Sequence, residues 1–181
     1  MVDIFIGIGS NIEPQKNVSK TIERLRLRFP SIVFSRTFES ESVGFNGDNF
    51  LNLVAKFEAK DLDLNRSSPS DLVAQYASSV DQLSFLIGQL KEIEIQLGRK
   101  KGGKKFSARN IDIDVLLFGD LQIDKPVELP RGEILGNAYV LWPLSELAPD
   151  LRHPESDKTY AEYWEEFDKT LQKLEPTQWN D

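Results

Sequence analysis

The sequence of 181 residues contains no cysteine and only one histidine. Without thiols, neither disulfides nor thiolate metal sites can form. No apolar run is long enough to cross a bilayer, and the N-terminus lacks the basic start and apolar segment of a signal peptide. We therefore expect a cytoplasmic protein. With 40% apolar and 28% charged residues, the composition is typical of a single globular domain, which we place at 1–181.

Familiar catalytic motifs are missing as well. The chain has no Ser-His-Asp set, no Walker-type glycine-rich lysine motif and no His/Cys zinc cluster. The single histidine, His153, lies in a Pro-flanked segment far from any other candidate catalytic group. We expect it to be structural or surface-exposed rather than a catalytic base.

Acidic residues outnumber basic ones, and the two kinds are unevenly distributed. The net charge of −7 argues against a general nucleic-acid binder. Residues 99–109 nevertheless hold six basic residues and no acid, so the rest of the chain carries −13. A local positive segment on an acidic body favours a small, strongly anionic ligand.

Asp112 and Asp114 lie two residues apart in an apolar segment. In an extended strand, residues i and i+2 point to one face, so the two carboxylates lie side by side while Ile111, Ile113 and Val115 face a core. Close carboxylates repel each other unless a cation or a proton neutralises them. Mg²⁺ is commonly held by one or two carboxylates together with substrate phosphates. The pair therefore predicts a magnesium site, although two solvated acids on an exposed strand would show the same spacing.

The hydrophobic pattern predicts the element order β-α-β-β-α-β. Strands are expected at 2–8, 31–39, 49–58 and 110–118, and helices at 14–29 and about 80–97. This order is that of the α+β ferredoxin-like arrangement, an antiparallel sheet with helices on one face. Beyond a core of about 1–154, an extension over about 155–181 is expected to be helical from the spacing of Tyr160, Trp164, Phe167, Leu171 and Leu174.

Several short blocks along the chain form a recognisable set. They are Ile-Gly-Ser-Asn at 8–11, Asn-Phe-Leu-Asn at 49–52, Leu-Gly-Arg at 97–99 with Ala-Arg-Asn-Ile-Asp-Ile-Asp-Val-Leu-Leu-Phe-Gly at 108–119, and Val-Leu-Trp-Pro-Leu at 140–144 with Glu-Leu-Ala-Pro-Asp at 146–150. In this order they resemble the 6-hydroxymethyl-7,8-dihydropterin pyrophosphokinase family of folate biosynthesis, over roughly residues 3–154. The resemblance implies an enzyme that transfers the β,γ-pyrophosphate of ATP to the hydroxymethyl oxygen of the pterin and releases AMP.

The resemblance also implies roles for individual residues. Two Mg²⁺ ions are implied as cofactors, with Asp112 and Asp114 as their ligands. The implied catalytic residues are these two aspartates with Arg99 and Arg109. Nucleotide contact is implied for Glu94, Arg99, Lys101, Lys105, Arg109, Ile113 and Arg131. Pterin contact is implied for Val43, Phe50, Asn52 and Tyr139. The expected partners are ATP and the pterin, with no nucleic acid and no membrane, and the chain is expected to be a monomer.

Two positions depart from the family pattern. The family usually has a histidine after the loop near residue 130 and an arginine a few residues later, where this chain has Arg131 and Asn137. Both family groups would be expected near the nucleotide. A divergent paralogue that binds pterin or nucleotide with little turnover is therefore an alternative. Retention of both aspartates argues against it, because idle metal ligands repel each other.

A nucleic-acid-binding domain is a third interpretation, since ferredoxin-like domains often bind RNA. Fold alone does not imply function. The aromatic pairs expected on the central strands of such a domain are not evident, and the body of the chain is acidic. This interpretation is therefore the weakest of the three.

Overall fold

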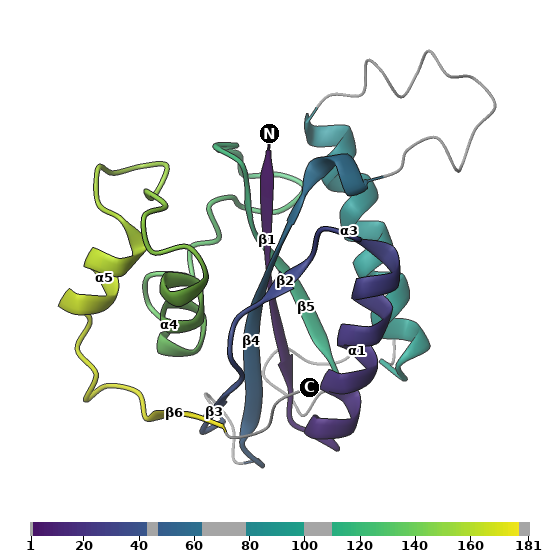
Figure 1. Cartoon of the computed structure of the whole chain (residues 1–181), viewed down its shortest axis with the longest axis horizontal. Helices are drawn as coiled ribbons and strands as arrows, with labels where there is room; N and C mark the ends of the chain where they lie inside the picture. Colours follow the sequence, from purple (N-terminus) through teal and green to yellow (C-terminus); the bar gives the residue numbers. More distant parts are fainter. Residues whose placement is uncertain (1, 43–46, 63–78, 100–109, 178–181) are drawn as a thin grey trace.

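The computed structural model describes residues 2–42, 47–62, 79–99 and 110–177. Its helices are α1 (Pro14–Arg28), α3 (Ser79–Gln96), α4 (Ala138–Leu147) and α5 (Tyr160–Glu166), with a 3-10 turn at Ala59–Asp61. Its strands are β1 (Asp3–Ser10), β2 (Val33–Phe34), β3 (Phe38–Ser40), β4 (Phe50–Glu58), β5 (Asp112–Phe118) and β6 (Leu174–Pro176) (Figure 1). Among these residues, no helix is both long enough and apolar enough to span a membrane.

All strand pairings in the single sheet are antiparallel. The order is β5-β1-β4-β3-β6, and β2 also pairs with β4. The predicted α+β class, antiparallel sheet and β-α-β-β-α-β order are confirmed. Because β5 stands at one end of this order, one side of its backbone has no neighbouring strand within the part of the chain that the structure describes. That open edge positions the candidate site.

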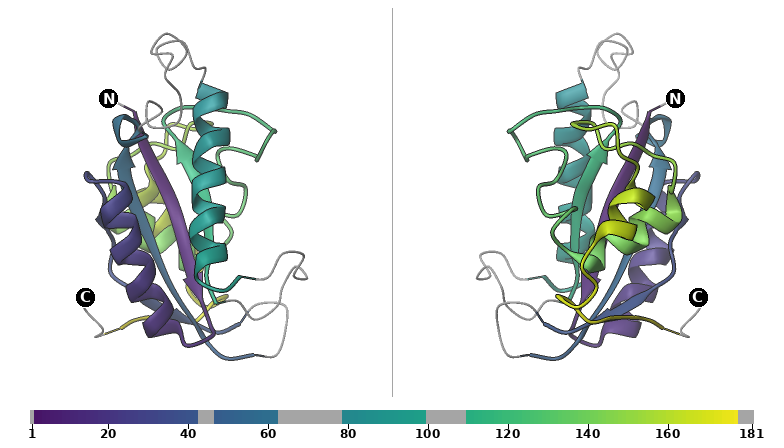
Figure 2. Two further views of the ribbon diagram at one scale, coloured as in Figure 1. Left: turned by 90° about the vertical axis from the view of Figure 1, so that its right-hand side faces the viewer. Right: turned by 90° about the vertical axis from the view of Figure 1, so that its left-hand side faces the viewer.

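Two separate apolar clusters cover the two faces of the sheet. On one face, α1 and α3 pack over the Ile4, Ile6 and Ile8 side of β1. On the other face, α4 and α5 pack over Phe5 and its neighbours, as the two views of Figure 2 show. The expectation of helices on one face therefore holds for the β-α-β-β-α-β pattern but not for the whole chain. Phe5 and Leu116 make the second face apolar as well, and such a face needs cover.

The strand predicted over 31–39 is divided into β2 and β3. At the break, the Ser35 hydroxyl accepts the backbone N–H of Val54 at 3.0 Å. The backbone N–H of Ser35 still donates to the carbonyl of Val54 at 2.9 Å. A side-chain oxygen thus replaces a main-chain acceptor, which interrupts the regular ladder with β4.

The predicted C-terminal helix is wrong beyond Glu166. Phe167 is in an extended conformation. The Asp168 carboxylate then accepts the backbone N–H of Thr170 at 2.9 Å and its hydroxyl at 2.6 Å. Such a local turn competes with helix continuation. The chain returns to the sheet, where Leu174 lies on β6 beside β3.

Candidate functional site

Asp112 and Asp114 lie on the sheet face that α4 and α5 cover. Ile113 and Val115 are buried in the cluster beneath α1 and α3. Because side chains alternate along a strand, the two aspartates project from the opposite face. Their side chains are 23% and 38% exposed, respectively. The prediction that the carboxylates share one face is confirmed.

Two glycines of β1 lie directly beside the aspartates. Gly9 pairs with Asp112 and Gly7 with Asp114 in the β1–β5 register. On its other side, Gly9 pairs with Asn52 of β4. A Cβ atom at Gly9 would lie 3.2 Å from Asn52 Oδ1, so a side chain there would crowd the amide. Gly7 and Gly9 thus form a glycine strip between β5 and β4, which was not expected from the sequence, and the Leu116 side chain packs over Gly7.

The open edge of β5 is covered by α3 and by the loop that follows β5. Glu94 of α3 is 3% exposed, and its Oε1 accepts the backbone N–H of Ile113 at 2.8 Å. The backbone N–H of Arg131 donates to the carbonyl of Leu116 at 3.0 Å. Both contacts satisfy main-chain groups that a neighbouring strand would otherwise pair. They also bring Glu94 and Arg131 next to the aspartate-bearing strand.

Each aspartate has an arginine beside it. Arg99, which follows α3, forms ion pairs with both Glu94 and Asp112, and its Nη1 lies 2.7 Å from Asp112 Oδ1. Nη2 of Arg131 lies 2.6 Å from Asp114 Oδ1. The resemblance placed both arginines at the nucleotide. In the structure, both are bound to the predicted metal ligands.

Glu94 is the most buried carboxylate of the site. Burial raises the pKa of Glu94 to about 7, and the charge of Asp112 adds to this rise. The N–H of Ile113 and the guanidinium of Arg99 act in the opposite direction. Burial has the larger effect on the pKa, because the free energy required to remove the charge from water exceeds the stabilisation by the N–H of Ile113 and by Arg99. Near neutral pH, Glu94 is therefore divided between its charged and neutral forms.

Glu133 and Tyr139 complete the acidic side of the site. Burial and the charge of Asp114 raise the pKa of Glu133, while Arg131 opposes the rise. Burial, followed by the charges of Glu133, Asp114 and Asp112, raises the pKa of Tyr139 to about 12. The Tyr139 hydroxyl therefore keeps its proton and is a hydrogen-bond donor. Glu133 was not predicted for the site, and its only sequence signal is its place two residues after Arg131.

Asn52 and Phe50 lie on β4, on the far side of the glycine strip from the aspartates. Asn52 is 6% exposed, and its Nδ2 donates to the Ser40 hydroxyl at 2.9 Å. The ring of Phe50 lies 3.7 Å from where a Cβ of Gly9 would be. Strands are about 4.8 Å apart, so Asn52 and Asp112, two strands apart in one row, are separated by roughly 10 Å.

The chain reaches Arg99 through a turn built on Gly98. Gly98 has φ +91°, and a Cβ atom there would lie 2.8 Å from Asn110 Nδ2. The same Asn110 Nδ2 donates to the carbonyl of Leu97 at 3.2 Å. The hydroxyl of Ser10 donates to the carbonyl of Asn110. The ends of α3 and β1 and the start of β5 are thus joined where Arg99 enters the site.

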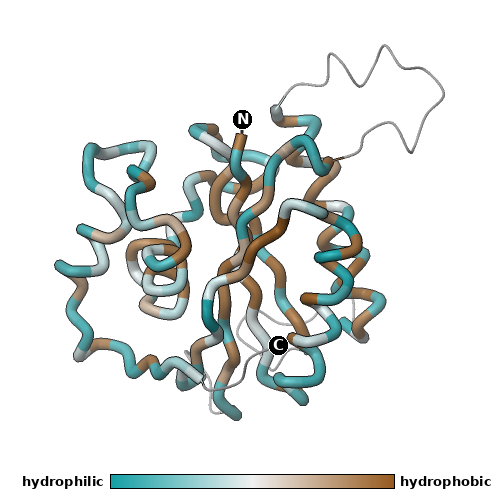
Figure 3. The backbone as a smooth tube through the Cα atoms, viewed as in Figure 1, coloured by the Kyte–Doolittle hydropathy of each residue, from teal (hydrophilic) through white to brown (hydrophobic). Residues whose placement is uncertain are grey.

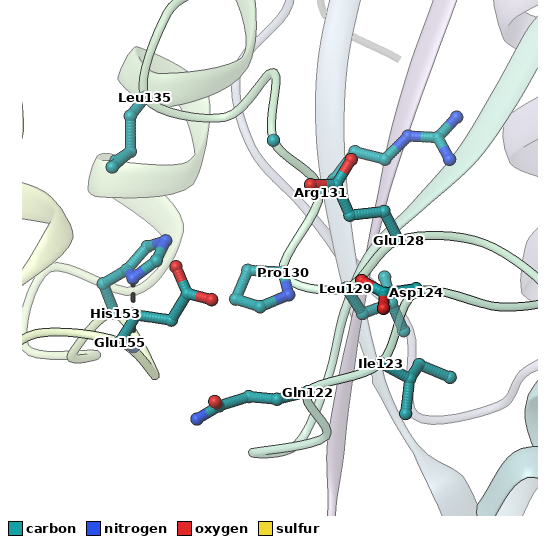
Figure 4. Close-up of a pocket in the computed structure, with 11 residues that line it drawn as sticks. Gln122, Ile123, Asp124, Glu128, Leu129, Pro130, Arg131, Leu135, His153 and Glu155 are labelled. Atoms are coloured by element: carbon teal, nitrogen blue, oxygen red, sulfur yellow. Dashed lines mark hydrogen bonds between the residues drawn. The ribbon is translucent and has the colours of Figure 1, made fainter.

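A pocket of about 350 Å³ lies between the loop around 122–132 and residues 153–155 (Figure 4). Its lining includes the carboxylates of Asp124, Glu128 and Glu155 together with Arg131. In Figure 4 the Arg131 guanidinium extends away from His153 and Glu155, toward the strands. His153 is buried, its Nδ1 accepts the N–H of Glu155 at 3.2 Å, and burial lowers its pKa. Its position agrees with the expected structural role.

Known proteins resemble this chain over most of its length. The family model for 7,8-dihydro-6-hydroxymethylpterin-pyrophosphokinase (HPPK) matches residues 67–149. The 2-amino-4-hydroxy-6-hydroxymethyldihydropteridine pyrophosphokinase of Aquifex aeolicus is 30% identical over 166 residues, which are 90% of this chain and 91% of that protein. The protein of the same name from Pseudomonas aeruginosa is 30% identical over 158 residues, 84% of each chain. The chain belongs to the HPPK family.

The fold agrees with this membership. A crystal structure of an HPPK-DHPS in complex with substrates has a TM-score of 0.58 to this structure at 11% sequence identity. The match covers 94% of this chain and 44% of that chain. The family resemblance expected from the sequence blocks is confirmed.

The HPPK-family chain brings most of its predicted site residues together around the start of β5. These are Phe50, Asn52, Glu94, Arg99, Asp112, Asp114, Arg131 and Tyr139. Ile113 is an exception, because its side chain is buried in the core on the opposite face and only its backbone reaches Glu94. Four predicted site residues lie outside the described residues: Val43, Lys101, Lys105 and Arg109.

The donor set of this HPPK-family site suits one kind of metal. Among the described residues, no group of three or more His, Cys, Asp or Glu side chains is arranged to hold a metal ion. Asp112 and Asp114 supply two carboxylates. Mg²⁺ typically binds one or two protein carboxylates and takes its other ligands from water and substrate phosphates. The residues therefore fit a magnesium ion bound together with a polyphosphate rather than a metal enclosed by protein.

Proposed function

We propose that this chain is a Mg²⁺- and ATP-dependent pyrophosphokinase. It transfers the β,γ-pyrophosphate of ATP to the hydroxymethyl oxygen of 6-hydroxymethyl-7,8-dihydropterin and releases AMP. One observation carries the proposal: the carboxylate pair of β5 and the buried amide of Asn52 lie on the same sheet face, two strands apart, across a glycine strip. The names of the relatives from Aquifex aeolicus and Pseudomonas aeruginosa describe a pyrophosphokinase of this pterin.

The β5 side of the face binds metal and phosphate. Asp112 and Asp114 hold magnesium, and Arg99 and Arg131 bind phosphate oxygens through their planar guanidinium groups. A magnesium ion held by these two carboxylates would supply charge neutralisation to the phosphates. The basic residues of 100–109, including Lys101, Lys105 and Arg109, remain predicted phosphate ligands outside the described residues. Such a site accelerates transfer by positioning and electrostatics rather than by a covalent intermediate.

The β4 side of the face holds the pterin. The absence of a side chain at Gly9 leaves the Asn52 amide uncrowded on the sheet face, and the ring of Phe50 lies beside it. An amide offers both a donor and an acceptor to the edge of a heterocycle, and Ser40 fixes the orientation of the Asn52 amide. Tyr139 contributes a protonated hydroxyl. We assign no general base.

A second candidate is a divergent paralogue that binds its ligands with little turnover. Asn137, which stands where the family usually has an arginine, donates from Nδ2 to the carbonyl of Glu133 at 2.9 Å. Its amide thus holds the loop before α4 and brings no positive charge to a nucleotide. A weaker nucleotide site follows from this replacement.

An assay of AMP release from ATP, Mg²⁺ and the dihydropterin tests the proposal. Asp112→Asn and Asp114→Asn keep the side-chain size and remove the charge, so each is expected to lower turnover below about 1% of the parent. Pterin binding, followed by fluorescence titration, is expected to persist. Asp120→Asn is the control, because Asp120 is an exposed aspartate just beyond β5. Undiminished AMP release by either site variant would remove the metal assignment, and tight pterin binding by a parent that releases no AMP would favour the paralogue.

A further inference from the structure

The backbone of Arg131 is held firmly beside Asp114. Its N–H donates to the carbonyl of Leu116 at 3.0 Å, and its own carbonyl accepts the N–H of Ile134 at 3.0 Å. These bonds fix the Arg131 Cα against the edge of β5, close to the second aspartate. The long side chain then determines where the charge lies, and its guanidinium extends toward the strands (Figure 4).

Among the described residues around Arg131, carboxylate side chains outnumber guanidinium groups. Four carboxylates and two guanidinium groups meet at the start of β5: Glu94, Asp112, Asp114, Glu133, Arg99 and Arg131. Without a divalent cation, arginine side chains are the counter-charge that limits repulsion among these carboxylates. The Arg131 and Asp114 side chains are 24% and 38% exposed. An ion pair with this exposure is weak enough to exchange for another partner.

We propose that Arg131 is an internal counter-ion that occupies Asp114 until the magnesium nucleotide binds, and that it then turns to the polyphosphate. This inference rests on the proposed function. The guanidinium lies 2.6 Å from Asp114 Oδ1. It therefore contacts one of the two oxygens through which Asp114 could bind magnesium at about 2.1 Å, and its positive charge would repel the ion. The same planar fork matches phosphate oxygens.

The proposal predicts opposite effects on two affinities. Loss of the Arg131 charge removes a competitor for the metal site, so a divalent cation alone binds more tightly. The same loss removes a phosphate ligand, so the nucleotide binds more weakly. A residue that merely stabilised the loop would weaken both together.

The test uses Mn²⁺ alone as the metal probe, with free Mn²⁺ counted by electron paramagnetic resonance in the absence of nucleotide. Arg131→Met keeps the apolar stem and is expected to bind Mn²⁺ on the order of tenfold more tightly than the parent. Arg36→Met is the matched control. Arg36 pairs with Glu146 and lies between β2 and β3, three strands away from β5, so the same charge loss there is expected to leave Mn²⁺ affinity unchanged.

Calorimetry with Mg²⁺ and α,β-methylene-ATP supplies the second affinity, which is expected to fall roughly tenfold in Arg131→Met. Unchanged or weaker Mn²⁺ binding by this variant overturns the inference, as does unchanged nucleotide affinity. Arg131→Gln carries the same expectations if the Met variant fails to fold. Asp114→Asn separates the two proposals: if it leaves parental Mn²⁺ binding intact, the metal assignment of the proposed function fails, independently of the Arg131 result.

Discussion

Glu94→Gln measures how much a buried carboxylate beside the site destabilises the fold. Glu94 is 3% exposed, and burial raises its pKa from 4.5 to about 7. Between these two values the folded chain binds more protons than the unfolded chain. Stability therefore falls as the pH rises through this window, the reverse of the usual case of a salt-bridged carboxylate. Glutamine keeps the acceptor oxygen for the N–H of Ile113 and does not titrate.

The magnitude follows from linkage. With pKa values of 4.5 unfolded and about 7 folded, the group costs roughly 1 kcal/mol at pH 5 and roughly 3 kcal/mol at pH 8. The parent should therefore lose about 2 kcal/mol of unfolding free energy between these pH values through Glu94, and Glu94→Gln should not. Titrating groups that do not interact with Glu94 contribute equally to both proteins and cancel in the comparison.

The assay is urea unfolding of both proteins at pH 5 and pH 8, without metal or nucleotide. Glu92→Gln is the control, because Glu92 lies exposed on the same helix, two residues away. It is expected to follow the pH dependence of the parent. If the curves of parent and Glu94→Gln stayed parallel within about 0.5 kcal/mol, the reasoning about burial would be refuted.

Two further substitutions test the surroundings of the site. Gly98→Ala places a Cβ atom at φ +91° and 2.8 Å from Asn110 Nδ2, so thermal unfolding is expected to show a loss of about 2 kcal/mol in unfolding free energy. Gly88→Ala lies in α3, where an added Cβ would meet nothing within 4 Å, and is expected to raise the unfolding free energy by about 0.5–1 kcal/mol. Equal behaviour of the two variants would contradict the backbone argument. Asn137→Arg is expected to raise the affinity for the magnesium nucleotide roughly threefold or more in calorimetry, although it loses the 2.9 Å hydrogen bond to the carbonyl of Glu133. Unchanged affinity would show that Asn137 does not mark a weakened nucleotide site.

Local periodicity was enough to predict most of the architecture. The strands β1, β4 and β5 and the helices α1 and α3 follow from alternation or helical spacing within each segment. The same alternation placed Asp112 and Asp114 on one face, because the side-chain period of a strand depends only on neighbouring residues. The C-terminal helix failed for the complementary reason. Its apolar spacing continues past Glu166, but the turn at Asp168 and the pairing of β6 with β3 end the helix there.

The partners of the site residues required the tertiary structure. Strand register places Gly9 between Asp112 and Asn52, and it joins segments that are far apart in the sequence. Glu133 has no recognisable motif and joins the site only because the loop after β5 folds back over the strand edge. The sequence alone thus determined which chemical groups the chain carries and how each segment alternates. Long-range packing decided which groups meet, and it placed Arg99 against Asp112 and Arg131 against Asp114. These contacts depend on strand order and burial rather than on spacing along the chain.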